Sequence, residues 1–191
     1  MKKELKKELA KKNKNKINWG WIIKIVVVAF TISILFSFAS ETAIPKLNVF
    51  WGVILTFIFV LIGVTFDMVG VSVTAADEHV FNSMAAKKIK GAKLAVKFKK
   101  NADKLSSFCQ DVIGDICGIV SGSTGAVIAI KIMNQLNTDN LLVTLIVMGV
   151  ISSLTIGGKA IEKAIAMNKS NEILYRFSYI VSFFVKEWLY E

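Results

Sequence analysis

The stretch LNVFWGVILTFIFVLIGVTF, residues 47–66, runs for twenty positions without a charged side chain. A helix of that length is about 30 Å long, which matches the hydrocarbon core of a bilayer. Residues 141–158 form a second uncharged run, and shorter apolar runs cover residues 25–40 and 116–130. The chain is therefore predicted to be an all-α integral membrane protein with about four transmembrane helices and cytoplasmic amphipathic helices.

Composition leaves little room for a soluble domain, because apolar residues make up 54% of the chain. The net charge of +10 might suggest nucleic acid, but the lysines flank the apolar runs, where they meet anionic lipid and set orientation. We therefore expect a lipid bilayer and no nucleic acid as partner. Cys109 and Cys117 lie eight positions apart on one predicted helix, about 12 Å along its axis, so they cannot form a disulfide with each other.

The distribution of lysine predicts the topology. Residues 2–16 and residues 87–104 each carry eight lysines, whereas the short segments 41–46 and 135–140 carry one lysine between them. The positive-inside rule then places the N-terminus, the linker 76–107 and the C-terminus in the cytoplasm of a multi-pass protein of the cell (cytoplasmic) membrane. The first apolar run can be read as a cleaved signal peptide or as an uncleaved anchor, and Lys24 within it favours the anchor.

The chain divides into three parts on this basis. Residues 1–17 form a basic cytoplasmic N-terminus, and residues 18–40 form the first transmembrane helix. Residues 47–191 form the main domain, with spans at about 47–75, 108–133 and 140–166 and amphipathic helices at about 78–104 and 171–190. The second amphipathic helix carries an apolar stripe at helical spacing, made of Ile173, Phe177, Ile180, Val181, Phe184, Val185 and Trp188.

Four ionisable residues fall at membrane depth and give the sharpest functional signal. They are Asp67, Asp111, Asp115 and Lys159. A charged side chain in hydrocarbon costs roughly 2.5 kcal/mol or more, so these residues are expected to face the bundle interior and to have partners. One interpretation is a cation pathway, and the other is a structural ion pair between Lys159 and Asp111 or Asp67.

Small and hydroxyl-bearing residues accompany these charges. Gly114, Gly118 and Gly122 recur every four residues, which predicts a close helix contact on the face that Asp111 and Asp115 share. Ser121 lies on the same predicted span, and Thr155 and Gly158 lie near Lys159 on the last one. Carboxylate and hydroxyl oxygens are ligands that Mg²⁺ prefers. We therefore predict Asp67, Asp111, Asp115, Ser121 and Thr155 as metal ligands and Lys159 as their charge partner.

Two segments carry a resemblance to a known family. Residues 155–166, TIGGKAIEKAIA, parallel a Gly-Glu-x-Ile-Pro-Lys-type motif at the end of a third span, with matches at Gly158, Ile161 and Lys163. Residues 87–105, KKIKGAKLAVKFKKNADKL, are similar to the family's basic linker, and Ile113-Gly114-Asp115 takes the place of its Ile-Gly-Asn. From about residue 48 onward the chain thus resembles the transmembrane domain of the CorB/CorC/cyclin M family of magnesium transport proteins.

The resemblance implies a homodimer whose cores bind a dehydrated Mg²⁺ in a cavity open to the cytoplasm, and we expect Mg²⁺ before Co²⁺ as the transported ion. It also implies a transporter. An enzyme with catalytic residues is not expected, because no nucleophile–base pair or metal-ligand spacing appears in the sequence. The paired CBS domains that usually follow are expected to be absent, so a separate CBS-domain protein is a possible partner. Lys159 stands at the family's intramembrane glutamate and Glu162 at its proline. This departure keeps a second function open: a non-transporting membrane scaffold or partner subunit in which Lys159 neutralises the acids.

Overall fold

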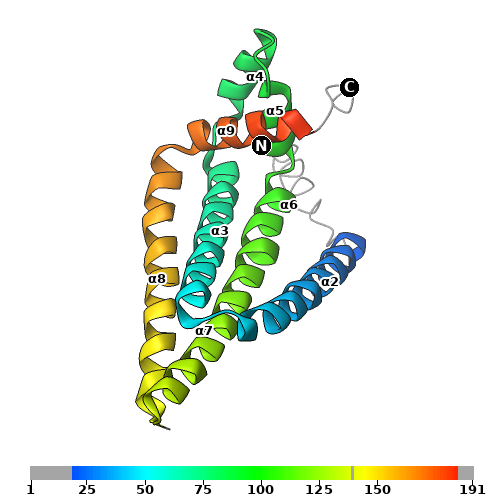
Figure 1. The fold of residues 1–191 in the computed structure, drawn as a ribbon. Coiled ribbons are helices and arrows are strands. Elements are labelled where there is room, and N and C mark those ends of the chain that lie inside the picture. Colours follow the sequence, from blue (N-terminus) through cyan, green and yellow to red (C-terminus); the bar gives the residue numbers. More distant parts are fainter. Residues whose placement is uncertain (1–18, 139, 185–191) are drawn as a thin grey trace, which may run out of the picture.

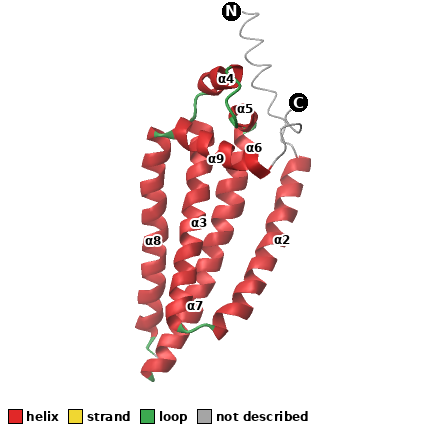
Figure 2. Cartoon of the chain, turned by 45° about the horizontal axis from the view of Figure 1, so that its top comes forward, coloured by secondary structure: helices red, strands yellow, loops and turns green. Residues whose placement is uncertain are grey.

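The computed structural model describes residues 19–138 and 140–184, and every element in that part of the chain is helical (Figure 2). Four helices are long and apolar enough to cross a membrane: Trp19–Ser40, Val49–Ala75, Ala102–Leu136 and Leu141–Asn168. They confirm the predicted fold class. The predicted basic N-terminus, residues 1–17, lies outside the described residues.

The spans are α2 (Trp19–Ala43), α3 (Val49–Ala75), α7 (Asp115–Leu136) and α8 (Leu141–Asn168). Asparagines mark their ends on one side of the bundle. Asn48 caps α3 by accepting a hydrogen bond from the Trp51 N–H at 3.2 Å, and Asn140 caps α8 by accepting one from Leu142 at 3.0 Å. Asn137 ends α7 in the left-handed conformation. The 3₁₀ turn η1 (Ile44–Lys46) joins α2 to α3 on the same side.

Helix α3 is the centre of the bundle and packs against both α7 and α8 (Figure 1). Glycine makes these contacts close. A Cβ on Gly63 would lie 3.0 Å from the Cys117 Cβ, and one on Gly158 would lie 2.9 Å from Val64 Cγ2. In lipid, where apolar burial does not drive association, such close packing holds helices together. Helix α2 contacts mainly α7. It joins the bundle near η1 and lies apart from the other three spans at its own N-terminal end (Figures 1 and 2).

Short helices cover the end of the bundle where α3 ends. They are α4 (Glu78–Ala86), α5 (Ala92–Lys100), α6 (Ala102–Ser107) and α9 (Ser170–Phe184), and α9 lies across the ends of the spans (Figure 1). The buried core here joins five elements through Val69, Val73, Ala76, Phe81, Ala95, Cys109 and Leu174. The second predicted amphipathic helix, 171–190, is thus seen as α9, and its residues 185–190 lie outside the described part.

The predicted continuous helix over 78–104 is wrong. A turn separates α4 from α5, with positive φ at Lys88 (55°) and Gly91 (82°). Gly91 also lies against the backbone of α9, because a Cβ there would be 3.0 Å from the Tyr179 Cα. A residue without a side chain both permits the left-handed backbone and lets α9 approach, so the chain reverses at this point.

The third span, Ala102–Leu136, is longer than the predicted 108–133 and contains a segment of π-helix. Helix α6 continues through the π-helical segment η2 (Phe108–Gly114) into α7. Such segments carry i→i+5 hydrogen bonds and often occur at functional sites. At this level α3 approaches closely, since a Cβ on Gly70 would lie 2.6 Å from Gln110 Cγ.

Candidate intramembrane ion site

An ion pair joins two spans in the interior of the bundle. Lys159 of α8 extends its Nζ to 3.2 Å from Asp67 Oδ2 of α3, and the Asp67 side chain is only 7% exposed whereas that of Lys159 is 33% exposed. The predicted pairing of Lys159 with Asp67, one of the two partners considered, is therefore present. An ammonium this close compensates a carboxylate that would otherwise be buried without a counter-charge.

The same lysine also reaches the third span. The Lys159 Nζ lies 3.9 Å from the point where a Cβ of Gly114 would be. A small cavity of about 10 Å³ lies beside it and is lined by Gly114, Gly118, Ser121, Thr155 and Lys159, together with residues of α3. That volume is close to the lower limit for one water molecule. Three spans thus meet at one small cavity, whose lining places Ser121, Thr155 and Lys159 among apolar residues.

Two predicted oxygen ligands line this cavity. The Ser121 hydroxyl donates to the Gly118 carbonyl at 3.0 Å, and the Thr155 hydroxyl donates to the Ile151 carbonyl at 2.9 Å. Each hydroxyl proton is thereby engaged within its own helix, while the oxygen keeps lone pairs that can accept. Ser121 is 1% exposed, so its oxygen is available only from the protein interior.

Glu162 is a site residue that the sequence analysis missed. It is 3% exposed, and neither of its carboxylate oxygens has a hydrogen-bond partner among the described residues. It lies close enough to Asp67, Lys159 and Lys163 to interact with their charges. The available signal was its spacing, because Glu162 follows Lys159 by three positions and so shares its helix face.

Asp111 and Asp115 lie elsewhere. Both are exposed in the single chain, so the expectation that they face the interior of its bundle is not met. The buried face of this span is carried instead by a stripe that includes Val112, Ile116 and Val120. Gly118 and Gly122, expected at a close helix contact, have nothing within 4 Å of an added Cβ. Their part of α7 is therefore open, although Gly118 also borders the small cavity.

The two acids that lie close together inside the bundle are thus Asp67 and Glu162, and Lys159 lies beside them. Across residues 19–138 and 140–184, no group of three or more His, Cys, Asp or Glu side chains is placed to hold a metal ion. Any cation bound at this point would rely on two carboxylates and on hydroxyl or backbone oxygens. Such a donor set suits a hard cation that keeps part of its water shell.

The fold and this site define a multi-pass helical membrane protein with paired charges at the junction of three spans. Residues 53–187 match the family described as the cyclin M transmembrane N-terminal domain, which is more than half of the 191 residues. The chain therefore belongs to the cyclin M transmembrane domain family, as the resemblance predicted. That family is associated with divalent cation transport. No curated protein and no solved structure gives a match.

Proposed function

We propose that this protein transports a divalent cation, Mg²⁺ before Co²⁺, across the cytoplasmic membrane. One observation carries the proposal: Glu162 is buried beside Asp67, and neither of its carboxylate oxygens has a hydrogen-bond partner in the part of the chain that the structure describes. A buried carboxylate without a partner costs folding free energy, and intramembrane acids commonly mark ion pathways. Family membership supports the same function.

The cation would bind between α3, α7 and α8. Asp67 and Glu162 would supply carboxylate oxygens. Ser121 and Thr155 line the adjacent cavity and would offer hydroxyl oxygens to an ion that passes through it. Lys159 acts as a built-in counter-ion, because two carboxylates and one ammonium leave a net charge of −1 when both acids are ionised. An arriving Mg²⁺ would compete with the ammonium for Asp67 and move it aside. The lysine thereby keeps the site stable between transport events.

The homodimer is the second part of this proposal. Asp111 and Asp115 are exposed on a span, where each charge facing lipid would cost roughly 2.5 kcal/mol. Ile119 on the same helix is 58% exposed, and Gly118 and Gly122 leave room for a close approach. A second copy packed on this part of α7 would remove the acids from lipid. The two aspartates then remain predicted cation ligands between the chains rather than within one.

Orientation follows from the lysines. The end of the bundle formed by α4, α5 and α6 carries the lysine-rich segment 87–104, which the positive-inside rule assigns to the cytoplasm. Asp67 and Lys159 lie in the halves of α3 and α8 that lead to this end, so the site would open inward. A separate CBS-domain protein stays a predicted partner on this side.

Mg²⁺ flux into proteoliposomes tests the proposal. The wild type should carry Mg²⁺, and Asp67→Asn and Glu162→Gln should each abolish most of the flux. The Asp111→Asn/Asp115→Asn pair tests whether the acids of the proposed interface take part. Asp103→Asn serves as the matched control, because Asp103 is an exposed acid on α6 outside the site. Absence of flux in a folded wild type, in both orientations and over a range of Mg²⁺, would overturn the transporter proposal.

The observed ion pair favours a second function. With Lys159 3.2 Å from Asp67, the protein can also be a membrane scaffold whose acid is neutralised permanently. Ligand binding separates the two functions, since a cation that binds only the folded state raises its stability by mass action. A scaffold should unfold identically with and without Mg²⁺, whereas a transporter should be stabilised, and Glu162→Gln should reduce that stabilisation.

A further inference from the structure

A large cleft separates α2 from the rest of the protein at the end of the bundle covered by α9. It holds about 620 Å³ and lies between α2 on one side and α5, α6, η2 and α9 on the other. This size falls within the range of about 300–1,000 Å³ that is typical of ligand sites. The cleft forms because α2 contacts the bundle mainly through α7 and diverges from it toward this end (Figures 1 and 2).

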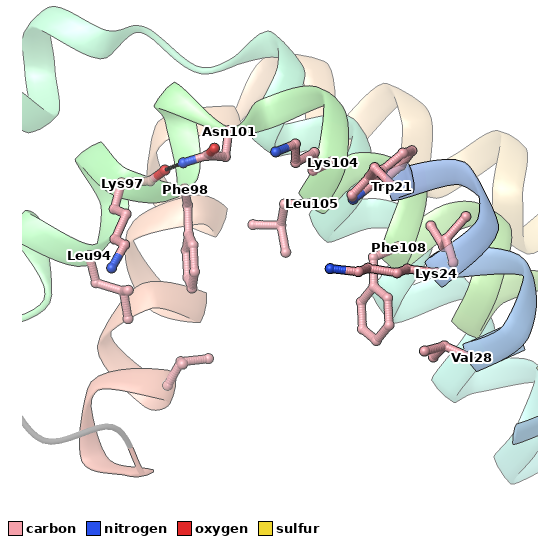
Figure 3. A pocket seen from close by; sticks show the side chains of 12 residues that line it. Trp21, Lys24, Val28, Leu94, Lys97, Phe98, Asn101, Lys104, Leu105 and Phe108 are labelled. Carbon is pink, nitrogen blue, oxygen red and sulfur yellow. Dashed lines mark hydrogen bonds between the residues drawn. The ribbon is translucent and has the colours of Figure 1, made fainter. Parts of the chain in front are cut away.

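Among the described residues, the walls of the cleft are mostly apolar, and the charged side chains that line it are lysines. Val28, Leu105 and Phe108 form part of the apolar lining, together with Phe98. Figure 3 shows the Lys24 side chain extending from α2 into the gap in front of Phe108, while Phe98 and Leu105 project from the opposite side. Lys104 and Lys97 complete the basic lining, and none of the described lining residues is acidic.

The position of the cleft narrows the class of ligand. Lys24 lies within the first span, near the end where Trp21 also lines the cleft. Tryptophan and lysine at the end of a span mark the headgroup level of a bilayer, and cytoplasmic leaflets carry the anionic lipids. Apolar walls that begin beside lysines therefore match a molecule with an acyl chain and a negative head.

We propose that this α2 cleft binds one anionic phospholipid of the cytoplasmic leaflet. Its phosphate lies between Lys24 and Lys104, and an acyl chain lies along Val28, Leu105 and Phe108. The lipid fills the gap that α2 leaves and links this helix to the remainder of the protein. The proposal does not depend on cation transport, because no residue of the ion site lines the cleft.

Native mass spectrometry of the full chain, released from vesicles of phosphatidylcholine with a minor share of phosphatidylglycerol, tests the proposal. One phosphatidylglycerol should be retained in preference to phosphatidylcholine. A lysine near an anionic lipid headgroup contributes roughly fivefold in binding, so Lys24→Gln/Lys104→Gln should reduce this preference roughly 25-fold. Lys93→Gln/Lys100→Gln, which removes two exposed lysines of α5 that do not line the cleft, should retain it.

A second variant separates the cleft from simple surface charge. Val28→Trp keeps every lysine but fills the apolar part, so it should also lose the retained lipid. The proposal would be overturned if Lys24→Gln/Lys104→Gln and Lys93→Gln/Lys100→Gln reduced the preference for phosphatidylglycerol equally. It would also be overturned if the wild type showed no such preference. Displacement of the lipid by soluble glycerol phosphate, or retention in Val28→Trp, would show a site for a free anion and would overturn it as well.

Discussion

Replacing Lys159 by methionine removes an ammonium and keeps a side chain of similar length. At 3.2 Å, the attraction between Lys159 and Asp67 is about 5 kcal/mol at an effective dielectric constant of about 20. The desolvation cost that both charges incur in the protein offsets part of this, and Lys159 is one-third exposed to solvent. We therefore expect Lys159→Met to lower the free energy of unfolding by about 2–3 kcal/mol in the absence of Mg²⁺.

Equilibrium unfolding in detergent micelles, followed by far-UV circular dichroism, measures this loss with a chelator present. If Mg²⁺ can take the place of the ammonium, it should restore much of the stability, because about 100-fold excess over the dissociation constant contributes about 2.7 kcal/mol. The Asp67→Asn variant and the double variant Asp67→Asn/Lys159→Met complete a thermodynamic cycle. The double variant should be more stable than the two single losses predict, since no unpaired charge remains.

Two results would refute this reasoning. A loss below about 0.5 kcal/mol in Lys159→Met, with additive effects in the cycle, would mean that the pair contributes no more than an exposed salt bridge. If Lys159→Met loses the full ~2–3 kcal/mol of stability and Mg²⁺ restores none of it, the ion pair is stabilising but no cation binds at this position. The scaffold function would then be the better account.

Three further variants test separate parts of the structure. Glu162→Gln should raise the free energy of unfolding by about 1 kcal/mol, because it removes a buried carboxylate that has no hydrogen-bond partner among residues 19–138 and 140–184. It should also weaken stabilisation by Mg²⁺ in the same unfolding assay. Gly91→Ala should lower it by about 1–2 kcal/mol, since φ is +82° and the new Cβ would meet Tyr179 at 3.0 Å; unchanged thermal unfolding would contradict this. Gly118→Ala should not lower the stability of one chain, since an added Cβ there meets nothing within 4 Å, but it should weaken the dimer, as measured by light scattering at several protein concentrations.

The spans were predictable from sequence because a bilayer imposes a fixed length of apolar helix. The expected spans 47–75 and 140–166 compare with Val49–Ala75 and Leu141–Asn168 in the structure. The turn between α4 and α5 was not predicted, although Gly91 was visible in the sequence. A single glycine within a lysine-rich helical pattern does not indicate that another helix, α9, will pack against its backbone.

The sequence by itself determined that charges enter the membrane, and it was sufficient to indicate Lys159 and Asp67. Only the tertiary structure decided that Glu162 is buried beside them while Asp111 and Asp115 face outward in the single chain. The reason is physical. In water the apolar side of a helix identifies its buried face, but in a membrane the lipid-facing and protein-facing sides are both apolar. The face that a span buries is therefore set by how its neighbours pack.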